Sequence, residues 1–157
     1  MIGIIEDKLT AFSIADKVHK KYSQVDIYLF DGDINKGIEI LKNKGCIIII
    51  TNSNINCTVP VISLNNNNPN NTYSLNDKEL IDYIEQGNIK LVKKYLNNLN
   101  IKEDTIILNN PKLLYIESII KEYFPNKKII NNIDYLLDEL DKYKSKFIGE
   151  GNLFYIN

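Results

Sequence analysis

The sequence predicts an α/β fold, an open parallel-sheet α/β sandwich, and two observations support this prediction. Short β-branched runs alternate along the chain with segments whose apolar residues recur at helical spacing, a pattern typical of parallel sheets covered by helices. The chain has 157 residues, of which 44% are hydrophobic, enough for one domain with its own core. We therefore expect residues 1–157 to form a single α/β domain.

The first half, residues 1–64, is predicted to contain four strands and two helices. The strands are expected at apolar runs bounded by polar residues, namely "IGII", "VDIYLF", "CIIIIT" and "VPVISL". Pro60 lacks an amide proton, so the fourth strand should lie at an entry or edge position. Apolar residues at helical spacing predict helices over 9–22 and from Ile34, the second closed by Gly45.

The second half, residues 74–157, follows an Asn-rich segment, 65–73, that is predicted to be a solvated connector. Ser74, followed three residues later by Asp77, indicates the start of a helix over about 76–86. Gly87 can end this helix. The remaining pattern predicts further helices and strands, in the order helix 89–99, strand "TIILNN", helix 114–124, strand "KKIINN", helix 133–140 and strand "NLFYIN".

Three of the predicted strands run directly into polar residues, in the segments "IIED", "IIIITNS" and "TIILNN". In open α/β sheets, ligands bind beyond the carboxyl ends of the strands, where loop amides and helix N-termini offer N–H groups. Hydroxyl and carboxamide groups at such an edge suit a small carboxylate or amino acid. The alternative, that Asn and Thr are simply good turn formers, stays open. The candidate ligand-binding residues are Glu6, Asp7, Thr51, Asn52, Ser53, Asn109 and Asn110.

Composition argues against several classes of partner. The chain has 19 basic and 20 acidic residues, a balance that does not favour nucleic-acid binding. It shows neither an apolar stretch of about 18 residues nor a signal peptide, so we expect a cytoplasmic protein that does not bind membranes. Cys46 and Cys57 lack the spacing of a zinc site, and we expect reduced thiols and no metal.

Several segments, taken in order, resemble one family. "IGIIEDKLT" has a strand, an acid and a Leu-Thr pair, "IYLFDGD" is a strand ending in Gly-Asp, and "KGCIIIITNSN" matches a strand that carries a catalytic Cys-Asn-Thr. "TIILNNPKLL" matches the segment that leads into a second catalytic Gly-Cys-Thr-His, and "GNLFYIN" matches a closing strand. This order resembles the glutamate racemase group of the aspartate/glutamate racemase family. Family members are longer, which implies a truncated second lobe here.

The resemblance implies racemisation without a cofactor, in which one thiol removes the α-proton and a second returns a proton on the other face. Thr51 stands at the first cysteine position and Asn110 at the second, with no His following. Neither an alcohol nor a carboxamide can replace a thiol as the proton shuttle, so we expect no racemase activity. A binding or regulatory role and a homodimer, which the family often forms, remain expectations.

Two alternatives stay open. Glu6 or Asp7 could supply a carboxylate base to an active racemase. Alternatively, "IIEDK" and the strand-helix-strand order of 31–50 resemble receiver domains, although Thr51 stands where that family carries a phosphorylatable Asp. The first half, up to about residue 64, also resembles the sensor domain of propionate-regulator type transcription activators.

Overall fold

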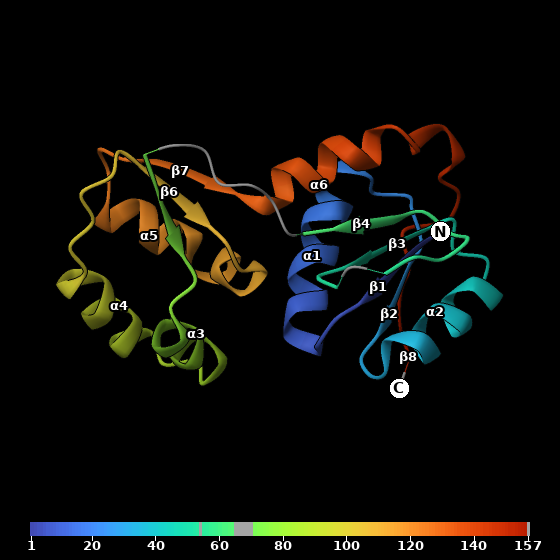
Figure 1. Cartoon of the computed structure of the whole chain (residues 1–157), viewed down its shortest axis with the longest axis horizontal. Helices are drawn as coiled ribbons and strands as arrows, with labels where there is room; N and C mark the ends of the chain where they lie inside the picture. The colour runs from blue at the N-terminus through green and yellow to red at the C-terminus, as the bar shows by residue number, and fades with distance from the viewer. Residues whose placement is uncertain (54, 65–70, 157) are drawn as a thin grey trace. The chain divides into compact units, whose positions relative to one another are not determined.

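The computed structural model describes residues 1–53, 55–64 and 71–156 (Figure 1). The chain forms two compact units: Met1–Asn66 together with Ile133–Asn157, and Asn67–Asn132. Each unit has its own parallel sheet, which confirms the predicted parallel α/β architecture. The description of residues 1–157 as one domain stays a prediction. Of the expected connector, residues 65–70 lie outside the described part, and Thr72 and Tyr73 belong to strand β5.

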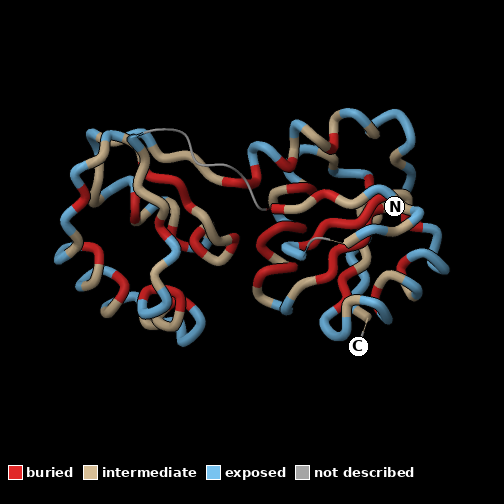
Figure 2. Tube along the Cα trace, in the orientation of Figure 1, coloured by how far each residue is buried: buried red, intermediate tan, exposed pale blue. Residues whose placement is uncertain are grey.

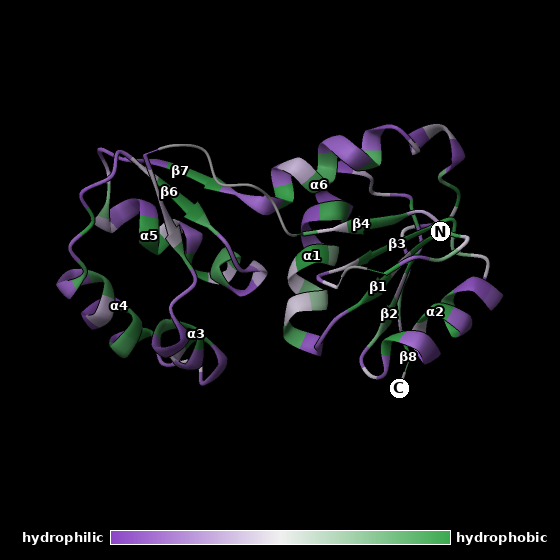
Figure 3. Cartoon of the chain, viewed as in Figure 1, coloured by the Kyte–Doolittle hydropathy of each residue, from purple (hydrophilic) through white to green (hydrophobic). Residues whose placement is uncertain are grey.

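The first unit is built on a five-stranded sheet with the order β4-β3-β1-β2-β8. Its strands are β1 Ile2–Ile5, β2 Ile27–Phe30, β3 Ile48–Thr51, β4 Val61–Ser63 and β8 Leu153–Ile156. The central strands are hydrophobic along their length because both faces of the sheet are covered, and they are drawn as buried in Figure 2 and as hydrophobic in Figure 3. Strand β4 lies at one edge directly after Pro60, as predicted.

Two helices of this unit lie on opposite faces of the sheet. On one face, Leu41 of α2 (Ile34–Asn43) packs so close to β1 that a Cβ added to Gly3 would lie 2.7 Å from its Cδ1. On the other face, Phe12 of α1 (Lys8–Lys21) stacks on Tyr155 with ring centroids 6.2 Å apart. The register aligns Gly3 with Phe154, the residue before Tyr155. Successive residues of a strand face opposite sides of the sheet, so Gly3 and Tyr155 mark its two different faces.

The last segment of the chain returns to the first unit. Helix α6 (Asn132–Asp141) packs against the end of α1, where Lys21 Nζ lies 2.9 Å from Asp141 Oδ2 and the Tyr22 hydroxyl donates to the same carboxylate. A 3-10 turn, Lys144–Lys146, leads on to β8. Asp26 then fixes the approach to β8, because its Oδ1 accepts hydrogen bonds from the amides of Glu150 at 3.0 Å and Asn152 at 2.9 Å.

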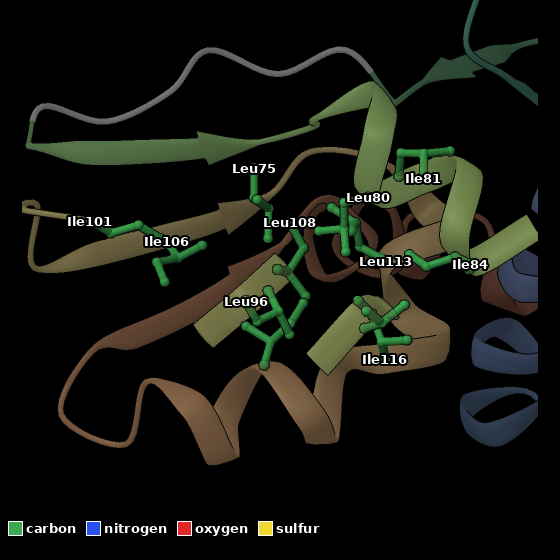
Figure 4. Close-up of a cluster of buried hydrophobic side chains, with 12 residues drawn as sticks. Leu75, Leu80, Ile81, Ile84, Leu96, Ile101, Ile106, Leu108, Leu113 and Ile116 are labelled. Carbon is green, nitrogen blue, oxygen red and sulfur yellow. The ribbon is translucent and has the colours of Figure 1, made fainter. Parts of the chain in front are cut away.

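The second unit has a three-stranded sheet with the order β5-β6-β7. Its elements are β5 Thr72–Leu75, α3 Lys78–Glu85, α4 Ile89–Asn98, β6 Thr105–Leu108, the 3-10 helix η1 Pro111–Ile116, α5 Glu117–Tyr123 and β7 Lys128–Asn131. Buried leucines and isoleucines from the helices and the sheet form one core, seen in Figure 4 around Leu80, Leu96 and Leu108. This core holds α3 and α4 in place.

The prediction that Ser74 begins the capping box of α3 is wrong, and the helix starts two residues later than the expected position of about 76. Ser74 lies within β5, where it pairs with Ile107 of β6, and its hydroxyl accepts a hydrogen bond from Asn109 Nδ2 at 2.8 Å. Asp77 is the N-cap residue of α3 instead. The ladder to β6 therefore extends the strand to Leu75, and the helix begins only at Lys78.

Candidate functional site

The carboxyl ends of β1, β3 and β4 meet at one edge of the first sheet. The register places Ile5 opposite Thr51 and Thr51 opposite Ser63, so the three strands end in line. The residues that follow them therefore share this edge. The structure thus brings together two of the three polar clusters predicted from the sequence, the one after β1 and the one after β3.

Glu6 joins these two strand ends. Its Oε1 accepts a hydrogen bond from the amide of Asn52 at 2.5 Å, while its own amide donates to the carbonyl of Phe30 at 3.2 Å. The carboxylate is half-buried. Glu6 therefore places one negative charge at the strand ends and orients the turn that follows β3.

Asp7 has a structural partner within its own helix. It is the N-cap of α1, and its Oδ1 accepts from the Thr10 amide at 3.1 Å. Its Oδ2 accepts from the Thr10 hydroxyl at 2.7 Å, and Thr10 is buried. Both carboxylate oxygens of Asp7 therefore contribute to the first turn of the helix.

Thr51 ends β3 with its side chain turned into the following loop. The residue is 2% exposed, and its Oγ1 accepts a hydrogen bond from the Ser53 amide at 3.3 Å. Beyond it lies a hollow of about 340 Å³ lined by Ser53, Ile55, Asn56, Val61 and Ser63. Ser53 is thus the predicted site residue that lines this hollow.

Two polar residues of the hollow were not predicted. Ser63 ends the run "VPVISL", so the rule that strand ends carry sites could have identified it. Asn56 lies in the loop after β3, and no local pattern distinguishes it from the other asparagines of the chain.

Asn109 and Asn110, the third predicted cluster, lie at the carboxyl end of β6 in the second sheet. Asn109 Nδ2 donates to Ser74 Oγ at 2.8 Å, and Asn109 Oδ1 accepts from Asn132 Nδ2 at 2.6 Å. Asn110 Oδ1 accepts from the Lys112 amide at 2.9 Å and caps η1. These bonds join the three strand ends of the second sheet, which gives both carboxamides a structural role.

The two cysteines differ in their surroundings. Cys46 is buried at the opposite end of the strand segment, and burial raises the pKa of its thiol to about 11. The Cys57 thiol donates to the carbonyl of Val59, with Sγ 3.0 Å from the oxygen. The described residues contain no group of three or more His, Cys, Asp or Glu side chains that could hold a metal ion.

No helix within the described ranges has the length and apolar character needed to cross a membrane.

Comparison with known proteins identifies the fold. No protein-family model matches the sequence, and no curated protein matches it. Among solved structures, the chain resembles glutamate racemase from Campylobacter jejuni (TM-score 0.73, 11% identity, 99% of this chain and 91% of that chain). It also resembles glutamate racemase RacE1 from Bacillus anthracis (0.70, 12%, 99% and 86%). A third is the Francisella tularensis glutamate racemase in complex with D-glutamate (0.62, 14%, 98% and 85%).

These similarities show a glutamate racemase-like fold. The alignments span 86% and 91% of the Bacillus anthracis and Campylobacter jejuni chains, so the truncation is modest. The truncated second lobe that the resemblance implied is therefore at most a modest truncation.

Proposed function

We propose that this protein binds a small carboxylate or amino acid at the carboxyl edge of the first sheet and does not racemise it. The observation that carries the proposal is the hollow of about 340 Å³ beyond β3 and β4, where the polar lining residues that the structure describes are neutral hydrogen-bonding groups. A glutamate racemase-like fold, with one such solved structure holding D-glutamate, supports the choice of ligand class.

The lining suits a carboxylate with a short carbon chain. The hydroxyls of Ser53 and Ser63 and the carboxamide of Asn56 can donate to carboxylate oxygens. Ile55 and Val61 supply an apolar wall. The strand ends beside the hollow also carry the Glu6 carboxylate, which suits the ammonium group of an amino acid.

The acid-base chemistry of the described residues supports the absence of racemisation. Racemisation by proton transfer needs a base and an acid on opposite faces of the α-carbon. The Thr51 hydroxyl, at the first expected cysteine position, is buried and accepts a hydrogen bond from a backbone amide. Asn110, at the second, has a carboxamide that does not titrate. Cys46 remains a protonated thiol at neutral pH because its pKa is raised to about 11.

The two parts of this proposal have separate tests. Thermal denaturation in the presence of D- or L-glutamate and aspartate measures binding, and a ligand at a hundredfold excess over its Kd should stabilise the folded protein by about 2.7 kcal/mol. Exchange of the α-hydrogen in deuterium oxide measures racemase chemistry, and none is expected with either enantiomer. Exchange of the α-hydrogen faster than in a control without protein would overturn the claim of inactivity.

A pair of matched variants tests the location of the site. Ser53→Ala removes one hydrogen-bond donor from the hollow and should weaken binding about fivefold, the equivalent of about 1 kcal/mol. Ser145→Ala, at an exposed position in the turn before β8, should leave binding unchanged. If none of the acids raises the melting temperature, or if Ser53→Ala binds as the parent does, the proposed site is wrong.

A further inference from the structure

The second unit carries a hollow of its own between α3 and α4. Its volume is about 290 Å³, and its lining includes Glu79, Tyr83, Leu91, Tyr95 and Leu99, with Lys94 also contributing. This volume suits a group of a few heavy atoms better than a large ligand. The two helices that form this hollow both pack on the buried core of the second unit (Figure 4).

Two tyrosine rings are held at a large angle to one another in this hollow. The ring centroids of Tyr83 and Tyr95 are 6.5 Å apart and the ring planes are inclined at 70°. Tyr83 donates its hydroxyl proton to Glu79 Oε1 at 2.7 Å, and Tyr95 donates to Asp77. Both rings are therefore fixed in direction by a carboxylate at their hydroxyl ends.

The pKa values of both tyrosines are raised by their surroundings. The bond to Glu79 raises the pKa of Tyr83, and burial, followed by the bond to Asp77, raises the pKa of Tyr95. A neutral phenol ring presents a partly negative face. A cation that lies over this face within about 6 Å of the ring centroid is attracted to it. Both rings line the hollow, and the 6.5 Å between their centroids allows one cation to lie within this distance of both centroids.

No protein cation occupies this position among the described residues. The ammonium groups that lie over aromatic rings are those of Lys8, over Tyr155, and Lys21, over Tyr22. Neither Glu79 nor Lys94 forms an ion pair with another described residue. Glu79 is exposed, lines the hollow, and its carboxylate lies beside the hydroxyl of Tyr83.

We propose that this hollow binds an alkylammonium group. Glu79 supplies the opposite charge, the faces of Tyr83 and Tyr95 attract the cation, and Leu91 and Leu99 contact its carbon atoms. The inference is independent of the carboxylate site proposed for the first unit. Among the described lining residues, Lys94 carries the one charge that opposes such a ligand, so its removal should strengthen binding.

The test uses the full chain labelled with ¹³C in its tyrosine rings, with tetramethylammonium chloride as the probe and sodium chloride holding the ionic strength constant. Saturable shifts are expected for the ring resonances of Tyr83 and Tyr95. Tyr155, which already has Lys8 over its ring, serves as the internal reference. Tert-butanol, a neutral molecule of similar shape, should give no saturable shift. Equal shifts with tert-butanol, or none with the cation, would overturn the proposal.

Charge variants distinguish binding at this hollow from a non-specific electrostatic attraction of the cation to the protein surface. Glu79→Gln removes an exposed opposite charge and should weaken tetramethylammonium binding about two- to fivefold, and Lys94→Gln should strengthen it. Glu85→Gln is the matched control, because Glu85 belongs to the same helix but pairs with Lys112, with Nζ and Oε1 2.6 Å apart. An equal loss in Glu85→Gln and Glu79→Gln, or weaker binding in Lys94→Gln, would contradict the assignment. Far-UV circular dichroism of each variant verifies that it is folded.

Discussion

Replacing Asp7 by alanine should destabilise the first unit by about 2 kcal/mol. The substitution removes the N-cap bond to the Thr10 amide, a loss of about 1 kcal/mol. It also removes the acceptor of the Thr10 hydroxyl, 2.7 Å away, and Thr10 is only 3% exposed. A buried hydroxyl that loses its partner costs about another 1 kcal/mol.

Two control variants isolate these contributions. Asn88→Ala removes a cap of the same kind from α4, where Asn88 Oδ1 accepts from the Leu91 amide at 3.2 Å, and it should cost about 1 kcal/mol. Asp7→Asn retains an oxygen that can accept from the Thr10 amide and should keep most of the stability.

Urea denaturation followed by far-UV circular dichroism measures the loss of stability, and hydrogen exchange of the α1 and α4 amides localises it to the helix concerned. The reasoning is refuted if Asp7→Ala unfolds at the same urea concentration as the parent. It is also refuted if Asp7→Asn is as unstable as Asp7→Ala, because the negative charge rather than the cap would then be what the fold requires.

Three further predictions concern the first unit. Hydrogen bonds from the backbone amides of residues 150–152 lower the pKa of Asp26 in the folded protein. The carboxylate therefore stabilises the fold above its unfolded pKa of about 4, and this stabilisation is lost as the pH falls through the lower folded pKa. Asp26→Asn should remove this acid dependence from urea unfolding curves. Gly37→Ala should destabilise the fold, because the new Cβ would lie 2.6 Å from Cδ1 of Phe30. Such overpacking costs about 1–3 kcal/mol, more than the helix-propensity gain of about 1 kcal/mol. An unchanged urea midpoint of unfolding would contradict this prediction. Maleimide at neutral pH should label Cys57 well before the buried Cys46, as peptide mass spectrometry can show, and faster labelling of Cys46 would refute the assigned burial.

The sequence by itself determined where most elements lie. The apolar run that ends in Thr51 forms β3, and the apolar residues at helical spacing from Ile34 onward form α2. Gly45 follows this helix with a φ of +86°. These signals are local, because they depend on side-chain periodicity and on backbone angles that glycine adopts without strain. The polar cluster after β1 and the one after β3 could be predicted in the same way, since parallel strands that pair in register end at one edge.

Only the tertiary structure decided which strands share a sheet and which polar groups serve the fold. Asn109 bonds to Ser74, 35 residues away, and to Asn132, 23 residues away, and the return of α6 and β8 to the first unit depends on contacts of Asp141 and Asp26 with still more distant residues. Such pairings depend on long-range packing and hydrogen bonding that leave no periodic signal in the chain. For the same reason the sequence could identify Glu6 and Asp7 as a polar pair after a strand, while only the structure assigned one to the turn after β3 and the other to the cap of α1.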